Sequence, residues 1–158
     1  MDLSPLRIGT ANDVHDIMEL AMSANEENGF IKATPEKMLH EIYASLTLNR
    51  GLMGIIGEPG KPAEGAVLLR LGEMWYSTEP VVEEKAIFIR PEHRSAKGGR
   101  ARRLCEFSKS VADGLGIPLI IGVLSNHRTE GKIRLYERQF GKPAGAFFLY
   151  GAETGKAN

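Results

Sequence analysis

Two segments near the start of the chain carry apolar residues at helical spacing. The first follows a short strand at residues 6–9 and a sequence with the spacing of a capping box, Thr10 to Asp13. The second begins at Thr34 and Pro35, which suit the N-cap and the first position of a helix. The apolar faces consist of Val14, Ile17, Met18 and Ala21 in the first segment and Leu39, Ile42, Tyr43 and Leu46 in the second. The pattern predicts one strand followed by two helices.

The middle of the chain alternates between β-prone runs and turns. Residues 51–57 and 65–77 read as strands joined by a connection rich in turn-forming residues. Thr78, Glu79 and Pro80 then reverse the chain into a third run over residues 81–89. These runs predict an antiparallel meander.

Helix and strand patterns alternate in the remaining third of the chain. A stripe of small and apolar residues predicts a helix over residues 101–115, which Gly116 ends. Residues 119–124 form a near-continuous apolar run, as expected of a strand covered on both faces. Residues 132–140 read as a helix and residues 144–150 as a last strand. The expected order is β-α-α-β-β-β-α-β-α-β, an α/β fold.

Composition narrows the range of functions. The 158 residues suit a single domain, and 20 basic residues balance 20 acidic ones, which argues against nucleic-acid binding. Cys105 is the only cysteine, and no Cys/His spacing suggests zinc, so neither a disulfide nor a metal is expected. The chain shows no signal-peptide pattern and no apolar run long enough to cross a bilayer. We expect a cytoplasmic protein with no membrane partner.

Positive charge concentrates in one short segment of this neutral chain. In residues 90–103, Glu92 is the only acidic residue, and the basic residues are Arg90, Arg94, Lys97, Arg100, Arg102 and Arg103. Gly98 and Gly99 precede the predicted third helix, whose first backbone N–H groups are unpaired and attract anions. The pattern predicts a phosphate site. The alternative is a simple glycine turn before a solvated basic face.

Residues 87–91 read Ile-Phe-Ile-Arg-Pro, a strand that ends at a proline before this glycine–arginine turn. Together with the element order, they resemble the GNAT superfamily of acyl-CoA-dependent N-acetyltransferases over nearly the whole chain. Members of that family carry a pyrophosphate loop of the form Gln/Arg-x-x-Gly-x-Gly/Ala, which this chain matches at Gly99 and Ala101. Ala96 replaces the usual Gln or Arg, so that contact is absent or comes from Arg94. The segments WYSTEP and EEKAIFIRPEHRS are similar to a branch common in phage-related sequences.

The resemblance implies a three-layer domain over residues 1–152, with a mixed, mostly antiparallel central sheet flanked by helices, and a polar tail at residues 153–158. It implies direct transfer of an acetyl group from acetyl-CoA to an amine of a small molecule, peptide or protein, without a metal. It also leaves a homodimer open. The alternative, for which the Ala96 replacement argues, is a catalytically degenerate domain that binds CoA as a sensor or assembly module.

The resemblance also implies which residues bind the cofactor. The backbone of a splayed strand pairs with the pantetheine amides, the loop binds the pyrophosphate, and an asparagine contacts the pantetheine arm. In this chain the corresponding residues are Phe88, Ile89, Arg94, Lys97, Gly98, Gly99, Arg100, Ala101 and Asn126. The separation between the asparagine and the next tyrosine is a few residues longer than in the family.

Acetyl transfer from a thioester requires a proton donor for the departing thiolate. The resemblance assigns this role to Tyr136, because a tyrosine on the helix after the fifth strand often points at the CoA sulfur in GNAT enzymes. The alternative is a packing role, since Tyr136 has helical spacing from Ile133 and Phe140.

The amine must also lose a proton before it attacks. Glu84 lies near the position of a general-base glutamate in several GNAT enzymes, and Glu83 and water are the alternatives. Consecutive strand residues point to opposite faces, so only one of the two glutamates faces the cleft. Glu84 is expected to share a face with Ala86 and Phe88, and it needs burial to raise its pKa.

Overall fold

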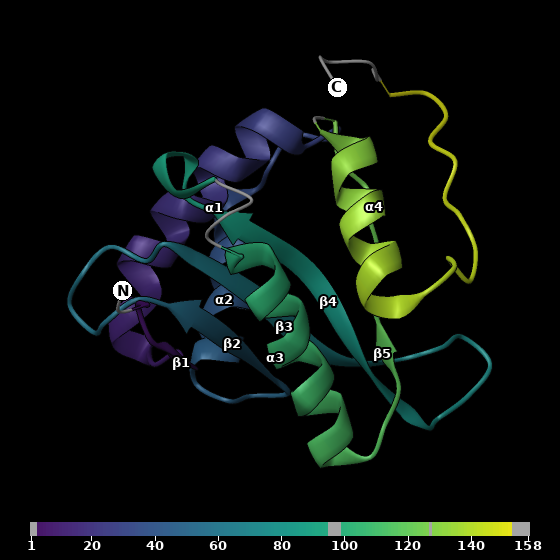
Figure 1. The fold of residues 1–158 in the computed structure, drawn as a ribbon, viewed down its shortest axis with the longest axis horizontal. Helices are drawn as coiled ribbons and strands as arrows, with labels where there is room; N and C mark the ends of the chain where they lie inside the picture. The colour runs from purple at the N-terminus through teal and green to yellow at the C-terminus, as the bar shows by residue number, and fades with distance from the viewer. Residues whose placement is uncertain (1–2, 95–98, 127, 153–158) are drawn as a thin grey trace.

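The computed structural model describes residues 3–94, 99–126 and 128–152 (Figure 1). The strands are β1 (Leu6–Ile8), β2 (Gly51–Ile56), β3 (Gly65–Glu73), β4 (Pro80–Ile89) and β5 (Leu119–Ile120). The helices are α1 (Val14–Asn28), α2 (Pro35–Leu46), α3 (Arg100–Leu115) and α4 (Thr129–Phe140). Short 3-10 turns at Ala11–Asp13 and Pro91–His93 precede α1 and follow β4.

Local sequence signals set several helix ends as predicted, whereas α4 begins at Thr129, before the predicted residue 132. The Asp13 carboxylate accepts a hydrogen bond from the Thr10 backbone N–H at 2.8 Å, as in a capping box. Pro35 is the first residue of α2. Gly116 ends α3 with φ of +69°, a left-handed conformation that glycine adopts without steric cost.

The five strands form one sheet in the order β1-β2-β3-β4-β5. The first four strands pair antiparallel, and β5 pairs parallel with β4, so the meander is confirmed. β3 ends at Glu73, earlier than the predicted residue 77. The mixed, mostly antiparallel sheet of an α/β fold is therefore present.

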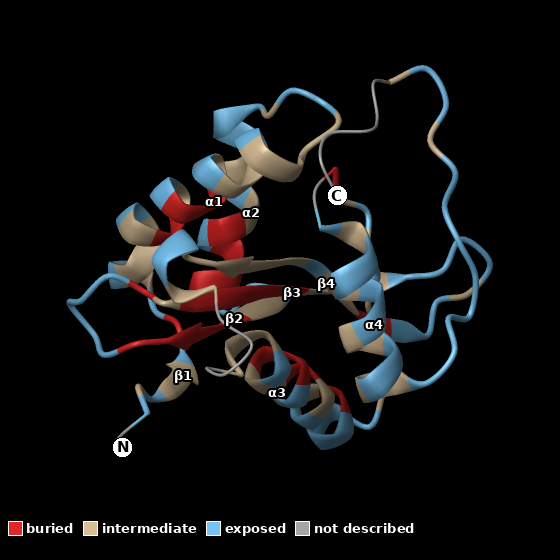
Figure 2. Ribbon diagram, turned by 45° about the horizontal axis from the view of Figure 1, so that its top comes forward, coloured by how far each residue is buried: buried red, intermediate tan, exposed pale blue. Residues whose placement is uncertain are grey.

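Helices cover both faces of the sheet, which makes the domain three layers deep (Figure 2). On one face Ile17 of α1 and Ile42 of α2 pack against Met53 and other residues of the strands. On the other face Leu104 of α3 packs against Val67 and further strand residues. Each face has a continuous apolar cluster, as the periodicity of the helices requires.

A β-bulge interrupts the pairing of β3 with β4. Leu68 pairs with Ala86, but Leu69 pairs with Glu84, so Lys85 is an extra residue in β4. Because of this extra residue, the β4 side chains before Lys85 point to the sheet face opposite to the one that simple alternation predicts. Glu84 therefore lies on the face of Leu69, toward α3, and the expectation that it shares a face with Ala86 and Phe88 was wrong.

Two expectations about the last strands were also wrong. β5 contains only Leu119 and Ile120, and exposed and partly buried residues alternate along residues 119–124, so this run is not covered on both faces. Residues 144–150 form no strand and are almost wholly exposed. The apolar character of both runs was correctly recognised, but their pairing depends on neighbouring strands, which apolar character does not reveal.

Candidate active site

The strands β4 and β5 pair over only two residues and then diverge. The pairs are Val82 with Leu119 and Glu83 with Ile120. Beyond them the backbone of β4 is left without a strand partner on this side, within the described residues. The part of β4 beyond this pairing is here called the open edge of β4, and the predicted site residues Glu84 of β4 and Tyr136 of α4 lie near its start.

Hydrogen bonding to β3 determines which backbone groups of β4 point to its open edge. The Arg90 N–H donates to the Glu64 carbonyl at 2.9 Å, so the alternating antiparallel pattern directs the backbone of Phe88 toward β3. The N–H and C=O groups of Ile87 and Ile89 point to the open edge instead. Of the two predicted residues, Phe88 and Ile89, only Ile89 presents its backbone to the open edge of β4. Ile87 also does so.

Glu84 lies where the pairing of β4 with β5 ends. One of its carboxylate oxygens accepts a hydrogen bond from the N–H of Gly122, in the connection after β5, at 3.3 Å. Burial raises the pKa of Glu84 to about 7, and the hydrogen bond from Gly122 and the charge of Lys85 oppose this only in part. The residue keeps some exposed surface, while its carboxyl group is enclosed among β4, α3 and α4.

Tyr136 and Cys105 share this interior with Glu84. Burial raises the pKa of Tyr136, and the negative charge of Glu84 raises it further. Burial likewise raises the pKa of the fully buried Cys105 thiol to about 12, with a smaller contribution from Glu84, so the thiol stays protonated and serves packing. The Tyr136 ring also packs edge-on against Phe140, with centroids 6.1 Å apart. The structure thus brings together the two predicted catalytic residues.

Asn126 is buried where the connection after β5 meets the end of α1. Its backbone N–H donates to the Asn28 carbonyl at 2.9 Å. Lys132 reinforces the contact, because its Nζ lies 3.1 Å from both the Asn28 Oδ1 and the Ser125 Oγ. Burial lowers the pKa of Lys132. Sequence analysis missed Lys132, although its spacing from Tyr136 places both on one face of α4.

The glycine turn has part of the geometry expected of an anion loop. Gly99 adopts φ of +60° immediately before Arg100, the first residue of α3. A Cβ at Gly99 would lie 2.9 Å from an Arg102 side-chain nitrogen. Lys97 and Gly98 lie outside the described residues, and Ala101 lies in the first turn of α3.

Several of the basic side chains in residues 90–103 form ion pairs with acidic residues. Arg94 pairs with Glu27 at 2.6 Å and also donates to the Ile89 carbonyl, while Arg100 pairs with Glu64 at 2.8 Å. Arg102 pairs with Glu106 at 3.0 Å. Acids remote in sequence neutralise Arg94 and Arg100, two of the three basic residues predicted to bind phosphate, which a count of charges along residues 90–103 could not reveal.

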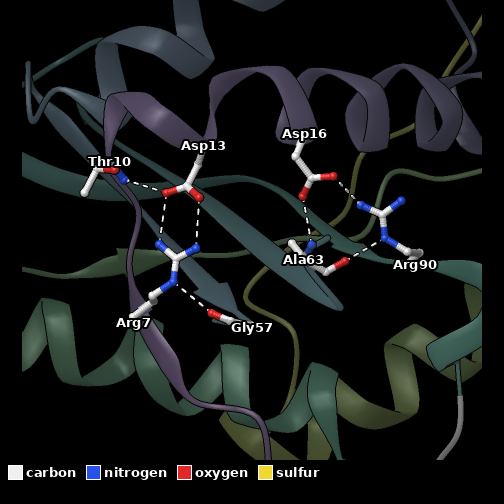
Figure 3. A network of polar contacts seen from close by, with 7 residues as sticks. All are labelled: Arg7, Thr10, Asp13, Asp16, Gly57, Ala63 and Arg90. Carbon is white, nitrogen blue, oxygen red and sulfur yellow. Dashed lines mark hydrogen bonds and ion pairs between the residues drawn. The ribbon is translucent and has the colours of Figure 1, made fainter. Parts of the chain in front are cut away.

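Arg90 belongs to a structural network beside the site (Figure 3). Its guanidinium donates to the Asp16 carboxylate at 2.8 Å and to the Ala63 carbonyl at 2.7 Å, and the Ala63 N–H donates to the other Asp16 oxygen at 2.8 Å. A second pair joins Arg7 to Asp13 through two bonds of 2.9 Å, and Arg7 also donates to the Gly57 carbonyl. Both networks attach α1 or its preceding turn to the β2–β3 connection.

A hollow of about 400 Å³ lies at the connection between α1 and α2. Met22 and Asn25 of α1 and Phe30 and Lys32 of the connection are among its lining residues. It borders the end of α1, which contacts Asn126 and Lys132. At the β3–β4 connection, Trp75 is almost fully exposed and packs edge-on against Tyr76.

The described residues contain neither a metal-binding cluster nor a membrane-spanning helix. No three His, Cys, Asp or Glu side chains come close enough together there to bind a metal ion. None of the helices in that part of the chain has the length and apolar character needed to span a membrane.

Solved structures with the same arrangement of helices and strands include several acetyltransferases. A possible acetyltransferase from Clostridium difficile 630 superposes with a TM-score of 0.70 over 94% of this chain and 97% of that chain, at 12% identity. The aminoglycoside N-acetyltransferase AAC(6')-Iy, bound to a bisubstrate analogue of CoA, gives a TM-score of 0.69 over 94% and 97%, at 15% identity. The chain has the GNAT fold.

A third GNAT neighbour acts on a different kind of acceptor. It is the ribosomal-protein-alanine N-acetyltransferase from Brucella melitensis biovar Abortus 2308, with a TM-score of 0.66 over 92% of this chain and 98% of that chain, at 14% identity. No protein-family model and no curated protein sequence matches the chain. The structural similarity establishes the GNAT fold, and at such low sequence identities it says nothing about the acceptor.

Proposed function

We propose that the protein is a GNAT-superfamily N-acetyltransferase that moves the acetyl group of acetyl-CoA directly to an amine. The observation that carries the proposal is the placement of Glu84 and Tyr136 in one interior, where β4 and β5 diverge. The GNAT fold, with CoA-bound neighbours among its matches, supports acetyl-CoA as the donor.

Glu84 is the proposed general base. A primary amine with a pKa of about 10.4 is almost entirely protonated at neutral pH, so a group must accept its proton before attack on the thioester. A carboxyl group with a pKa of about 7 is suited to this task, because its ionised form is both populated and basic enough near neutral pH. Gly122 orients one carboxylate oxygen and leaves the other for the acceptor.

Tyr136 is the proposed general acid for the CoA thiolate. The charge of Glu84 raises the pKa of Tyr136, so protonation of Glu84 by the amine removes that effect. The phenol therefore becomes a better acid at the moment when the thiolate departs. This coupling gives each proton transfer a role in the other and requires no covalent acyl-enzyme.

The cofactor would lie along the open edge of β4. The outward N–H and C=O groups of Ile87 and the outward N–H of Ile89 are suited to pair with the pantetheine amides, whereas the Ile89 carbonyl already accepts a hydrogen bond from Arg94. An N–H at this edge can stabilise the oxyanion of the tetrahedral intermediate. Asn126 lies at the end of α1, where it would contact the pantetheine arm. The pyrophosphate would bind at the turn formed by Gly99.

The test is a thiol-release assay with acetyl-CoA over polyamines, amino acids, aminoglycosides and peptide N-termini. The proposal expects at least one acceptor to be acetylated, with mass spectrometry showing the product. Calorimetry with CoA alone measures cofactor binding separately. Absence of CoA binding would overturn the proposal, because donor binding precedes any choice of acceptor.

A CoA-binding sensor or assembly module is the second candidate. The separation of Asn126 from Tyr136, which is longer than in the family, motivates it. CoA binding without turnover of any acceptor would support this candidate. Turnover that depends on Glu84 and Tyr136 would eliminate it.

A further inference from the structure

The connection between β3 and β4, residues 74–79, presents two aromatic side chains to solvent at the end of the sheet (Figure 1). Trp75 is 96% exposed and Tyr76 is 63% exposed, although tryptophan is mostly buried in folded proteins. Their rings lie at 87° with centroids 5.6 Å apart, so they form two walls of a corner, here called the aromatic corner. We propose that the aromatic corner docks a basic segment of a partner protein by holding one of its lysine or arginine side chains.

The hollow beside the aromatic corner has the chemistry of a cation site. It has a volume of about 690 Å³ and is lined by residues 73–78. These residues supply two aromatic rings, the Glu73 carboxylate and two hydroxyl groups, and they include no basic residue. A cation above an aromatic face is attracted by the negative charge of the π system, and tryptophan binds cations best.

Two acidic side chains flank the aromatic corner. Glu73 and Glu79 are exposed, and the ion pairs in the described part of the chain involve neither of them. Glu27 and Glu64, near the proposed cofactor site, are by contrast paired with arginines. The uncompensated negative charge beside the exposed rings complements a basic partner, and it repels nucleic acid and an anionic membrane surface.

Backbone pairing and hydrogen bonds fix the connection that carries the two rings. The pairing of β3 with β4 extends to Glu73 and Pro80, directly before and after the connection. Within it, the Ser77 N–H donates to the Met74 carbonyl at 3.2 Å, and the Glu79 N–H donates to the Ser77 Oγ at 3.0 Å. A site that is already ordered loses less conformational entropy when its partner binds.

The exposure of the rings favours a protein segment over a small free cation. Small-molecule pockets bury most of the surface of their ligand, and a hollow whose main wall is the almost fully exposed Trp75 cannot do so. A protein segment can also cover the outer surfaces of both rings, and tryptophan and tyrosine are typical anchors of protein interfaces. The aromatic corner and the Gly99 turn lie at opposite ends of β4, so this partner would not compete with the proposed cofactor.

The first experiment uses the fluorescence of Trp75, the only tryptophan in the chain, so the emission reports this site alone. The probe is a short peptide of alternating arginine and glycine with blocked ends, and the control peptide has glutamine in place of arginine. We expect a saturable change with the arginine peptide, weaker at higher salt, and none with the glutamine peptide. Arginine is not an amine acceptor and no acetyl-CoA is present, so the result is independent of the proposed function. An equal response to both peptides, or none to either, would overturn the proposal.

The second experiment measures the affinity of variants for the arginine peptide by calorimetry. Trp75→Leu keeps an apolar side chain but removes the π face, and we expect it to weaken binding about 5–30-fold. Glu73→Gln and Glu79→Gln should each weaken it about 2–5-fold. The controls Tyr150→Leu and Glu36→Gln change an exposed aromatic residue and an exposed acid elsewhere, and should bind as the native protein does. Native affinity in Trp75→Leu, or equal losses in the controls, would mean that the peptide binds acidic surface in general.

A membrane surface is the competing occupant, because tryptophan and tyrosine also favour the interface between lipid and water. Neutral and anionic phospholipid vesicles are therefore added to the native protein without peptide. We expect neither kind of vesicle to shift the emission of Trp75 to shorter wavelength. Such a shift, together with no response to the arginine peptide, would assign the aromatic corner to a membrane and refute docking of a basic protein segment.

Discussion

At the scale of single residues, burial holds the Glu84 carboxyl group in an environment that favours its neutral form. Its pKa in the folded protein, about 7, exceeds the ordinary value of 4.5. Between these values the native protein keeps a proton that the unfolded chain has lost, so stability falls as the pH rises through this window.

Glu84→Gln should therefore stabilise the fold, by about 1–3 kcal/mol at pH 8, and give no gain below pH 4.5. The same substitution should lower kcat/KM about 10²–10⁴-fold, because the amide cannot accept the amine proton. Urea unfolding at both pH values and the thiol-release assay measure the two effects. Glu83→Gln is the control, since Glu83 pairs with Lys85 at 3.4 Å on the opposite face. A destabilised or fully active Glu84→Gln protein would contradict this assignment.

Tyr136→Phe separates proton donation from packing, because it keeps the ring that packs against Phe140. We expect unchanged CoA affinity in calorimetry and a kcat lower by about 10–10³-fold, since water replaces the phenol only in part. Tyr43 was expected on the apolar face of α2 but is half exposed, so Tyr43→Phe should leave kcat unchanged. A Tyr136→Phe enzyme with native kcat would assign the residue to packing.

At the scale of elements, the Arg7–Asp13 pair attaches the start of α1 to the β2–β3 connection through Gly57. The hydrogen bond from Arg7 lowers the pKa of Asp13, so this stabilisation is present above the ordinary value of 3.8 and is lost as the pH falls through the lower folded value. Asp13→Asn should reduce the free energy of unfolding by about 1–3 kcal/mol at pH 7. The loss should shrink in acid, where the native carboxylate is also protonated.

Urea titration of Asp13→Asn at neutral and acidic pH provides the measurement. Asp113→Asn is the matched control, because Asp113 is exposed near the end of α3. Equal losses at both pH values would show that the contribution of Asp13 does not depend on its charge.

Predictability differed among the elements for physical reasons. Periodicity and capping residues are local, so they located α1, α2 and the meander. The facing of Glu84 depends on the bulge at Lys85, which arises from the pairing of two strands and has no local signature. The same limit applies to residues 144–150, whose composition is β-prone although they form no strand.

The candidate site shows the same division. The resemblance to GNAT enzymes pointed to Glu84 and Tyr136 as candidates, but only the fold reveals that the two residues lie close together. The neutralisation of Arg94 and Arg100 by Glu27 and Glu64 could not be predicted, because these acids are remote in sequence. Lys132 was missed because its partners, Asn28 and Ser125, come from two separate segments.

At the scale of the whole molecule the net charge is zero, and at the proposed cofactor site Arg94 and Arg100 are each paired with an acid, Glu27 and Glu64. A CoA phosphate that binds Arg94 or Arg100 must compete with Glu27 or Glu64. Salt screens both the new contact and the pair that it replaces, so the affinity of the native protein for CoA should change little between low and physiological salt.

Removing the competing acids should expose the hidden charge. We expect Glu27→Gln and Glu64→Gln each to tighten CoA binding by about 2–5-fold at low salt, since exposed and partly exposed ion pairs contribute up to about 1 kcal/mol. Both variants should also make the affinity depend more steeply on salt, because the freed arginine then contacts the phosphates without compensation. Calorimetry at two salt concentrations measures this, with Glu58→Gln as the control, whose partner Lys61 lies in the β2–β3 connection. Steep salt dependence in the native protein, together with no gain in either variant, would mean that other basic residues bind the phosphates and that Arg94 and Arg100 serve only the fold.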